Sequence, residues 1–367
     1  MLTTTRAALL SLGLHVLAWT VASGLFGLVR YYGLGSIEDF AGYGIQDPPV
    51  GWFVSQVALA GVVLGLPFGL ISLAFHRPRF RSVSYARLIG LQSTVHVVLI
   101  VVVLGVFRAQ GFAELGQPFR VDVWFGRTFS SNTVVVLIFS AVTSVIIGFV
   151  HQANRKFGPG NLWKIFLGKY HHPRVESRIF MFLDLQSSTT HAERLGHVRY
   201  SRLIQDCFRD LAVVLADHAE VYQYVGDEAV LCWETERGLS LGRCLRAFYR
   251  FDAELVSREQ HYQREYGLVP VFKAGLNVGD VTVAEVGEIK REIAYHGDVL
   301  NTAARIQARC NELGKRVLIS EDLKDALGDL PAFVFERLGT VALRGRGQTV
   351  DIFAVEPSAA GAALSQR

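Results

Sequence analysis

The chain has 367 residues, of which half are hydrophobic and only 19% are charged, and its mean hydropathy is +0.29. Residues 1–154 contain nine Arg, no Lys and five acidic residues, whereas the remaining 213 residues contain 56 of the 70 charged side chains. The charged fraction is therefore about 9% in the first part and about 26% in the second, which is ordinary for a globular domain. This division excludes a single soluble domain, a disordered chain and a small disulfide scaffold.

The first part contains four stretches without Asp, Glu, Lys or Arg, each long enough to cross a hydrocarbon core of ~30 Å as a helix. We therefore predict a four-helix transmembrane domain over residues 1–154. A secretory signal is the alternative for the first stretch, but its apolar run is too long and no small-residue cleavage site follows it. The stretches are Ala7–Val29, Val50–Phe75, Leu88–Phe107 and Thr128–Asn154.

Basic residues predict the orientation of these helices. Positive charge gathers in the connection between the second and third helices and again after the fourth, which predicts that both ends face the cytoplasm. We expect a multi-pass protein of the bacterial inner-membrane type, in contact with membrane lipid. No nucleic-acid partner is expected, because no binding signature accompanies the net charge of +4. The basic residues are Arg77, Arg79, Arg81, Arg87, Arg155, Lys156, Lys164 and Lys169.

Two further patterns occur inside the predicted membrane helices. Gly61, Gly65 and Gly69 recur at every fourth position, a spacing that allows a second helix to approach closely, although Gly is also common in membrane helices without such a role. His15 and His96 lie on different helices. Two such histidines can ligate a cofactor, but a hydrogen-bonded interior histidine is more common, and the pattern leaves this open.

The second part is predicted to contain a juxtamembrane linker at residues 155–177, a folded domain at 178–357 and a C-terminal tail at 358–367. The linker mixes basic and large apolar residues, which suits a membrane surface or a coupling element. The domain follows the order β-α-β-β-α-β-β, which predicts an α/β (α+β) ferredoxin-like fold with helices on one face of a sheet. Its predicted elements are strand Arg178–Leu185, helix His191–Val214, hairpin Glu220–Val225 and Ala229–Trp233, helix Leu239–Tyr266, and strands Val269–Val278 and Asp280–Val286.

Two acidic residues are predicted to lie at the tips of adjacent strands. Asp184 is near the end of an apolar strand, and the hydroxyl-rich turn after it opens a helix whose free N–H groups can bind phosphate. Asp227 follows Gly226 at a hairpin tip, where an Asp is ordinarily only a turn residue. Together, however, two such carboxylates are what a two-metal phosphoryl-transfer site requires.

Two further segments with arginine residues follow later in the chain. Asn301 and Arg305 are four residues apart and project from one face of a helix. An amide and a guanidinium so placed can orient a ribose and neutralise charge on a phosphoryl group. Arg344 and Arg346 lie in a Gly-broken turn that either closes on a polyphosphate or is simply a solvated hairpin.

The segments FLDLQSST, QYVGDE, HGDVLNTAAR and LRGRG occur in this order within residues 178–356, nearly half of the chain. Together they resemble the catalytic domain of class III nucleotidyl cyclases, the adenylate and guanylate cyclase family. The resemblance implies conversion of a nucleoside triphosphate into a 3′,5′-cyclic nucleotide and pyrophosphate. It also implies two Mg²⁺ or Mn²⁺ ions and a head-to-tail homodimer with its sites at the interface.

The family's functional residues can be carried over position by position. The resemblance makes Asp184 and Asp227 the metal ligands, and it makes Asn301 and Arg305 the residues that orient the ribose and stabilise the transition state. Either Arg344 or Arg346 matches the family residue that holds the terminal phosphates, and the pattern does not choose between the two. The nucleotide-binding positions that follow the first Asp are Leu185, Ser187, Ser188 and Thr189.

Two positions depart from the family pattern. Adenylate cyclases have a Lys four residues before the second metal Asp, and an Asp or Thr three residues before the Gly of the Asn/Arg motif, where this chain has Gln223 and Ala294. The Glu and Cys of guanylate cyclases are absent as well. Because an amide can donate to an adenine ring nitrogen and accept from its amine, ATP is favoured over GTP or a pyrimidine nucleotide. Tyr295 or His296 is a candidate to replace the missing side chain at 294.

Two other functions stay open at this stage. The departures at Gln223 and Ala294 are compatible with an inactive cyclase-like module that binds nucleotide or a partner under control of the membrane part. A diguanylate cyclase is disfavoured, because the hairpin tip lacks the first Gly and the Phe of the GG[DE]EF pattern.

Overall fold

The structure is a computed structural model in which the chain divides into two compact units, Met1–Leu162 and Trp163–Arg367. We call them the helical unit and the catalytic unit and describe each by itself. The structure describes residues 2–33, 49–75, 83–114, 118–157, 161–342 and 349–359.

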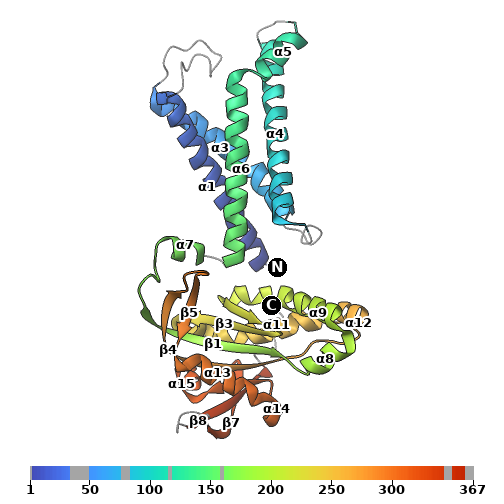
Figure 1. Ribbon diagram of the computed structural model, residues 1–367, viewed down its shortest axis with the longest axis vertical. Coiled ribbons are helices and arrows are strands. Elements are labelled where there is room, and N and C mark those ends of the chain that lie inside the picture. Colours follow the sequence, from blue (N-terminus) through green and yellow to red (C-terminus); the bar gives the residue numbers. More distant parts are fainter. Residues whose placement is uncertain are drawn as a thin grey trace. The chain divides into compact units, whose positions relative to one another are not determined.

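The helical unit is built from four long helices that pack against one another (Figure 1). Trp19, Phe68 and Ile100 form its small buried core, whereas many other large apolar side chains are exposed. Within the described residues, three helices (α1, α4 and α6) are long and apolar enough to cross a membrane, and α3 contributes a shorter apolar stretch. The helices are α1 (Leu2–Gly33), α3 (Val50–Phe75), α4 (Tyr85–Glu114), the short α5 (Val121–Thr128) and α6 (Ser131–Phe157).

The glycine repeat of α3 lies directly against α1. A Cβ atom added at Gly61 would stand 2.7 Å from the backbone oxygen of Trp19, and one added at Gly65 would stand 2.9 Å from the Cα of Val16. Both distances are shorter than side chains tolerate, so only glycine permits this approach. The predicted role of the repeat in close helix packing is therefore confirmed.

His15 and His96 of the helical unit are buried, and both have hydrogen-bonding neighbours. The Nδ1 atom of His96 lies 2.8 Å from the hydroxyl oxygen of Ser144, and its ring stacks on Phe68. The Nδ1 atom of His15 lies 3.3 Å from the backbone oxygen of Ser11. Hydrogen-bonded interior histidines are the more common of the two outcomes that the sequence leaves open.

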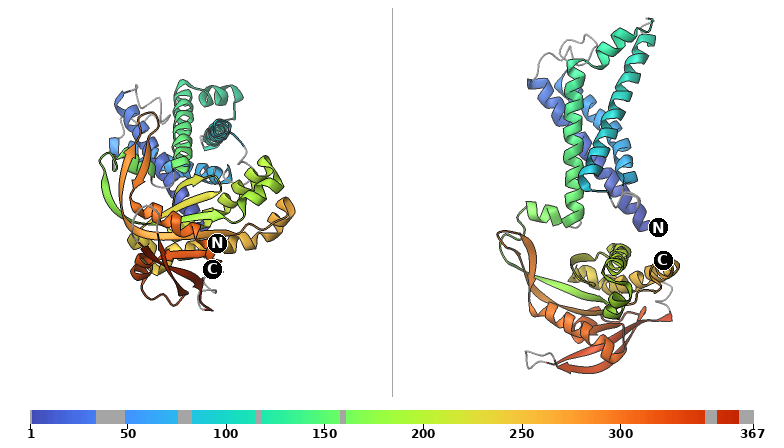
Figure 2. Two further views of the ribbon diagram at one scale, coloured as in Figure 1. Left: turned by 60° about the horizontal axis from the view of Figure 1, so that its bottom comes forward. Right: turned by 45° about the vertical axis from the view of Figure 1, so that its right-hand side comes forward.

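The catalytic unit contains one eight-stranded mixed sheet in the order β2-β3-β1-β4-β6-β8-β7, with β5 paired to β4. Strand β1 is antiparallel to both of its neighbours, β3 and β4. Beyond Val283, β4 continues past the end of β1 and forms a two-stranded arm with β5 (Figure 2). The strands are β1 (Arg174–Leu185), β2 (Glu220–Val225), β3 (Glu228–Glu234), β4 (Phe272–Val286), β5 (Glu292–His296), β6 (Val317–Ser320), β7 (Phe333–Ala342) and β8 (Thr349–Pro357).

Helices cover both faces of this sheet. Side chains of β1 alternate: Ile179 and Met181 pack against one group of helices, and Phe180 points to the opposite face, where Val299 and Ala303 of α13 pack. A helix-covered sheet was predicted, but the expectation of helices on one face only is wrong, because α13 covers the second face (Figure 1). The first group is α8 (Ser188–Leu195), α9 (His197–Asp210), α11 (Arg243–Ser257) and α12 (Glu259–Tyr266), and α10 (Thr235–Leu239) and α15 (Glu321–Leu327) add side chains to the same core. On the second face, α13 (Asp298–Ala308) is followed by α14 (Cys310–Leu313).

Three predicted elements have different boundaries in the structure. The strand pair expected over residues 269–286 is a single strand, β4, because Gly279 and Asp280 continue the ladder with β1 instead of turning. The helix expected over 191–214 ends at Gly196, where φ is +71°, and begins again at His197. The helix expected over 239–266 is interrupted near Gly242, where φ is +62°, and again between α11 and α12.

A buried charge network joins the first residues of the catalytic unit to its sheet. Arg178 on β1 is fully buried and pairs with Glu176 and Glu220. Lys164, in α7 (Asn161–Phe166), lies 3.2 Å from Glu220 at the start of β2, and Lys169 lies 3.1 Å from Glu176. The segment that precedes β1 is thus attached to the strand that leads to Asp227.

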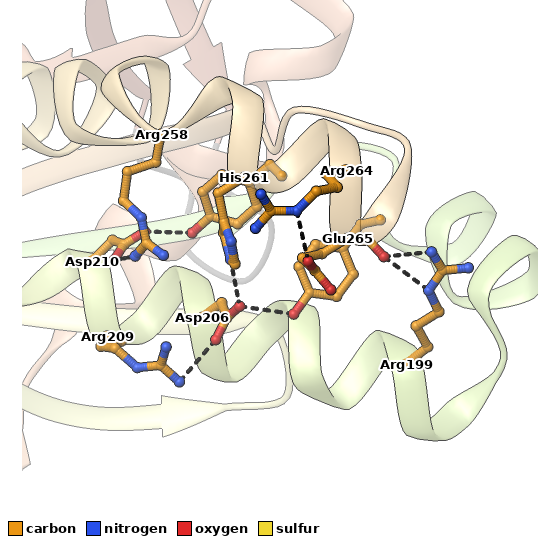
Figure 3. A network of polar contacts seen from close by, with 10 residues as sticks. Arg199, Asp206, Arg209, Asp210, Arg258, His261, Arg264 and Glu265 are labelled. Atoms are coloured by element: carbon orange, nitrogen blue, oxygen red, sulfur yellow. Dashed lines mark hydrogen bonds and ion pairs between the residues drawn. The ribbon is translucent and has the colours of Figure 1, made fainter. Parts of the chain in front are cut away.

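A second polar network fixes α12 on α9 (Figure 3). One oxygen of Asp210 accepts a hydrogen bond of 2.6 Å from Tyr262, and the other pairs with Arg258. Asp206 accepts a hydrogen bond of 2.8 Å from Tyr266. Burial opposes ionisation of Asp206, but hydrogen bonds from His261 and Tyr266 outweigh it, so the pKa of this carboxyl lies below its usual value.

We expect Asp210→Ala to lower the free energy of unfolding by about 2–4 kcal/mol, because it leaves Arg258 and Tyr262 without their shared acceptor. Denaturant-induced unfolding of the protein measures this change. The control is Arg264→Ala on the partner helix α12, which removes an exposed ion pair with Glu265 and should change stability by less than about 0.5 kcal/mol. Equal effects of the two substitutions would contradict the assigned role of the network.

Candidate active site

Asp184 and Asp227 come together at neighbouring strand ends. Asp184 on β1 lies opposite Glu228, the first residue of β3, and Asp227 precedes Glu228 in the hairpin turn. Burial, together with the negative charges of Asp184 and Asp227, raises the pKa of the Glu228 carboxyl. Three carboxyl groups therefore share one small region.

The carboxylate of Asp184 has two donors on its own chain. The Lys273 ammonium nitrogen lies 3.2 Å from Oδ2, and the Gln307 amide donates a hydrogen bond of 3.0 Å to the same oxygen. Lys273 is directly opposite Asp184 in the β1–β4 register, and Gln307 lies on α13.

Asp227 is in a different environment. Its Oδ2 atom is buried and has no hydrogen-bond partner within the described part of the chain. Tyr200 on α9 faces the same carboxylate and the Ser188 hydroxyl, and burial together with the Asp227 charge raises the pKa of Tyr200 to about 12. A buried carboxylate oxygen without a donor is costly unless a cation or another ligand satisfies it.

This donor set fits a divalent cation. Carboxylate oxygens are the ligands that Mg²⁺ prefers, and such sites usually combine one or two carboxylates with substrate phosphates. Among the residues that the structure describes, no group of three or more His, Cys, Asp or Glu side chains is arranged to hold a metal ion. A cation at Asp184 and Asp227 would therefore need further oxygen ligands from a bound phosphate.

Helix α13 presents its polar residues to different sides. Gln307 is buried against Asp184, whereas Asn301 is exposed and Arg305 is half-buried. Successive helix residues turn by about 100°, so Arg305 and Gln307, two residues apart, project about 200° apart. Arg305 therefore points away from the Asp184 of its own chain.

The two positions that are predicted to select the base lie next to a pair of tyrosines in contact. The rings of Tyr222 and Tyr295 are 4.9 Å apart, and Gln223 and Ala294 are their immediate neighbours in sequence. Tyr295 also packs on Phe180 in the sheet core, and burial raises the pKa of its hydroxyl. Tyr295 is thus half-buried against the core, whereas His296 is exposed, and the suggested role of either residue beside Ala294 stays a prediction.

The remaining predicted nucleotide-binding positions differ in how accessible they are to a ligand. The Leu185 side chain is buried in the core, which leaves only its backbone for a ligand. Ser187 adopts a left-handed conformation with φ of +57° at the start of α8 and is exposed, as is Thr189. Arg344 and Arg346 lie between β7 and β8, outside the described residues.

The sequence patterns did not indicate Lys273, Gln307 or Tyr200 as neighbours of the two aspartates. Lys273 is placed by strand register, which a sequence does not fix, and Tyr200 by the break at Gly196. Gln307 is six residues beyond Asn301 on the same helix. The only sequence signal for the contact of Gln307 with Asp184 is that a polar side chain occurs on the buried face of α13.

Comparisons with known proteins identify the family of the catalytic unit. Residues 171–356 match the family model described as adenylate and guanylate cyclase catalytic domain. The chain therefore belongs to this family, and its enzyme class is that of an adenylate cyclase-type phosphorus–oxygen lyase.

Individual relatives extend the likeness beyond the catalytic unit. The chain is 32% identical to Adenylate cyclase 2 of Rhizobium meliloti (strain 1021) over 305 residues, which cover 81% of this chain and 83% of the relative. A solved bacterial light-regulated adenylyl cyclase is similar with a TM-score of 0.51 at 20% identity, over 65% of this chain and 70% of the other. The second likeness concerns the fold alone.

We expect Gly275→Ala to disturb the site through packing alone. A Cβ atom at Gly275 would stand 2.2 Å from the backbone nitrogen of Gln307, so α13 must shift, at a cost of about 1–3 kcal/mol. Chemical denaturation measures the loss of stability. Gly90→Ala in α4, whose Cβ would meet nothing within 4 Å, is the control and should be harmless. An unchanged unfolding free energy for Gly275→Ala would show that the helix does not lie on this strand.

Proposed function

We propose that the protein is a membrane-anchored nucleotidyl cyclase that converts a nucleoside triphosphate, preferentially ATP, into a 3′,5′-cyclic nucleotide and pyrophosphate. The observation that carries the proposal is the pair Asp184 and Asp227 at adjacent strand ends in a chain of the cyclase family. One of these carboxylates, Asp227, has a buried oxygen that accepts no hydrogen bond from any residue that the structure describes, which is what a cation site would leave in its ligand-free form.

Asp184 and Asp227 are the proposed ligands of two Mg²⁺ or Mn²⁺ ions. When bound, such ions lower the pKa of a ribose hydroxyl and stabilise charge on phosphate oxygens. In this proposal the backbone at Leu185 and the turn with Ser187, Ser188 and Thr189 line the phosphates at the start of α8. Arg344 or Arg346 receives the terminal phosphates.

The proposed active form is a homodimer with its sites at the subunit interface. Support comes from α13: Gln307 contacts the Asp184 of its own chain, and Arg305 projects from the opposite side of the helix. A guanidinium that points away from its own carboxylate pair can serve only another copy. Asn301, which is exposed, would orient the ribose there, and Arg305 would neutralise charge as it develops on the α-phosphate.

The ribose 3′-oxygen then attacks the α-phosphorus in line, and pyrophosphate leaves. The 3′-hydroxyl proton passes to solvent or a phosphate oxygen, because the proposal assigns no side-chain base to it. Rate acceleration would come from positioning and charge stabilisation, with no covalent intermediate.

For the base, Gln223 is the proposed reader. It is exposed on β2, and its amide can donate to an adenine ring nitrogen while it accepts from the exocyclic amine. Ala294 on β5 offers no polar group, and His296 is the exposed side chain two residues further along that strand. A flipped Gln223 amide would suit guanine, so the nucleotide panel below includes GTP, CTP and UTP.

The proposed anchor is a transmembrane domain of four helices at residues 1–154. Three helices meet the length and hydropathy expected of a membrane span, and α3 contacts α1 along its whole glycine repeat. The basic residues predict that both ends face the cytoplasm. A linker at 155–177, the catalytic domain at 178–357 and a tail at 358–367 complete the proposed organisation.

We expect the purified full-length protein with Mn²⁺ to produce cyclic AMP from ATP in preference to the products of GTP, CTP and UTP, as resolved by mass spectrometry. Asp227→Asn should reduce turnover at least about a hundredfold, since several kcal/mol of charge stabilisation depend on the metal site. This variant is the cleaner test, because the Oδ2 atom that it replaces has no hydrogen-bond partner among the described residues.

The control for this prediction is Asp280→Ala, which removes an exposed carboxylate on β4 and should leave turnover unchanged. A wild-type protein that binds nucleotide but forms no product would favour the inactive signalling module. Full activity in Asp227→Asn would refute the site.

Co-expression tests the shared site. Asp227→Asn and Arg305→Ala should each be inactive alone. When the two are co-expressed in equal amounts, about a quarter of wild-type activity should return, because half of the dimers are mixed and each mixed dimer contains one intact site. Activity is measured on membranes with matched protein amounts. No recovery in mixed dimers isolated with two different tags would exclude sites built from two chains.

A further inference from the structure

Gln307 is a buried polar residue whose contact the proposed chemistry does not use. It lies near the end of α13, its side chain is 6% exposed, and its Nε2 atom donates a 3.0 Å hydrogen bond to Oδ2 of Asp184. A buried amide on an otherwise apolar helix face costs stability unless it is paired. The partner that it has is a carboxylate of the candidate metal site.

The same carboxylate oxygen is held from a second direction by Lys273. The ammonium nitrogen lies 3.2 Å from Oδ2 of Asp184 and 3.2 Å from the amide oxygen of Asn311. Two donors thus share Oδ2. A carboxylate held in this way presents its second oxygen in a fixed direction.

The two donors differ in how firmly they are placed. Lys273 extends along a flexible four-carbon stem and can follow the carboxylate if it rotates. The backbone of Gln307 is fixed, because α13 lies so close to β4 that a Cβ atom at Gly275 would be 2.2 Å from the Gln307 nitrogen. The amide therefore restrains the carboxylate, and the ammonium only neutralises it.

We propose that Gln307 is a positioning residue that keeps Oδ1 of Asp184 available to a divalent cation. This proposal rests on the proposed function, which makes Asp184 a metal ligand. Without the amide, the carboxylate can turn until both of its oxygens pair with Lys273. The ammonium then competes with the cation for Oδ1, and the affinity for metal falls.

The test uses Gln307→Met in the full-length protein, because Met has nearly the same shape but no donor. Binding of Mn²⁺ is measured by the decrease of its free electron paramagnetic resonance signal, with and without a non-cyclisable ATP analogue. The apparent Kd for Mn²⁺ should rise about tenfold or more, as is usual when a partner of a metal ligand is removed. In cyclase assays the metal requirement should rise equally, while kcat at saturating metal changes little.

Asn277→Leu is the matched control. Asn277 is also a buried amide facing α13, and it donates a 3.3 Å hydrogen bond to the backbone oxygen of Val299 without touching Asp184. The Asn277→Leu variant should leave the Kd for Mn²⁺ unchanged. If both variants weaken Mn²⁺ binding equally, Gln307 only helps to dock the helix, and the proposal is wrong. It is also wrong if Gln307→Met binds Mn²⁺ like the wild type.

The readout separates this inference from the proposed function. Mn²⁺ binding does not require turnover, so a wild-type protein without cyclase activity would refute the function and leave the binding comparison valid. Conversely, an active wild type with unchanged Mn²⁺ binding in Gln307→Met would refute only the role of Gln307. Thermal unfolding without metal confirms that the variants are folded.

Discussion

The close approach of α13 to β4 constrains much of the catalytic unit. At Gly275 the helix and the strand are in backbone contact, and no side chain larger than hydrogen fits between them. This contact fixes the rotation of the helix about its own axis. As a result, the Gln307 side chain faces the sheet and Arg305 projects from the opposite side of the helix. In the proposed dimer, Gln307 therefore contacts its own chain, and Arg305 is directed to the other subunit.

Charge balance at the site follows from strand register. Asp184, Asp227 and Glu228 bring three carboxyl groups to one end of β1 and β3, and Lys273, directly across the sheet from Asp184, supplies a cation. Three carboxyl groups thus face one ammonium group, and burial together with the charges of Asp184 and Asp227 raises the pKa of the Glu228 carboxyl. A site with such an excess is suited to divalent cations and to the polyphosphate that they accompany.

Local patterns were enough to predict the strand with Asp184, the β2–β3 hairpin with Asp227 in its turn, and the helix with Asn301 and Arg305. The close packing at the glycine repeat of α3 could also be predicted, because it depends on residue spacing alone. Features that depend on long-range contacts could not be predicted. Gly279 and Asp280 look like a turn, yet pairing with β1 keeps β4 extended. Burial of Tyr295 against Phe180 likewise depends on neighbours that lie more than a hundred residues away in sequence.

The charge network around Arg178 has a consequence for where the catalytic unit begins. The family match starts at residue 171, but Lys164 and Lys169 precede it and pair with Glu220 and Glu176. A soluble fragment cut at the start of the family match would lose both lysines while it keeps the fully buried Arg178 and its two acidic partners. A fragment intended to retain the native sheet should therefore begin at Trp163, where the compact unit itself begins.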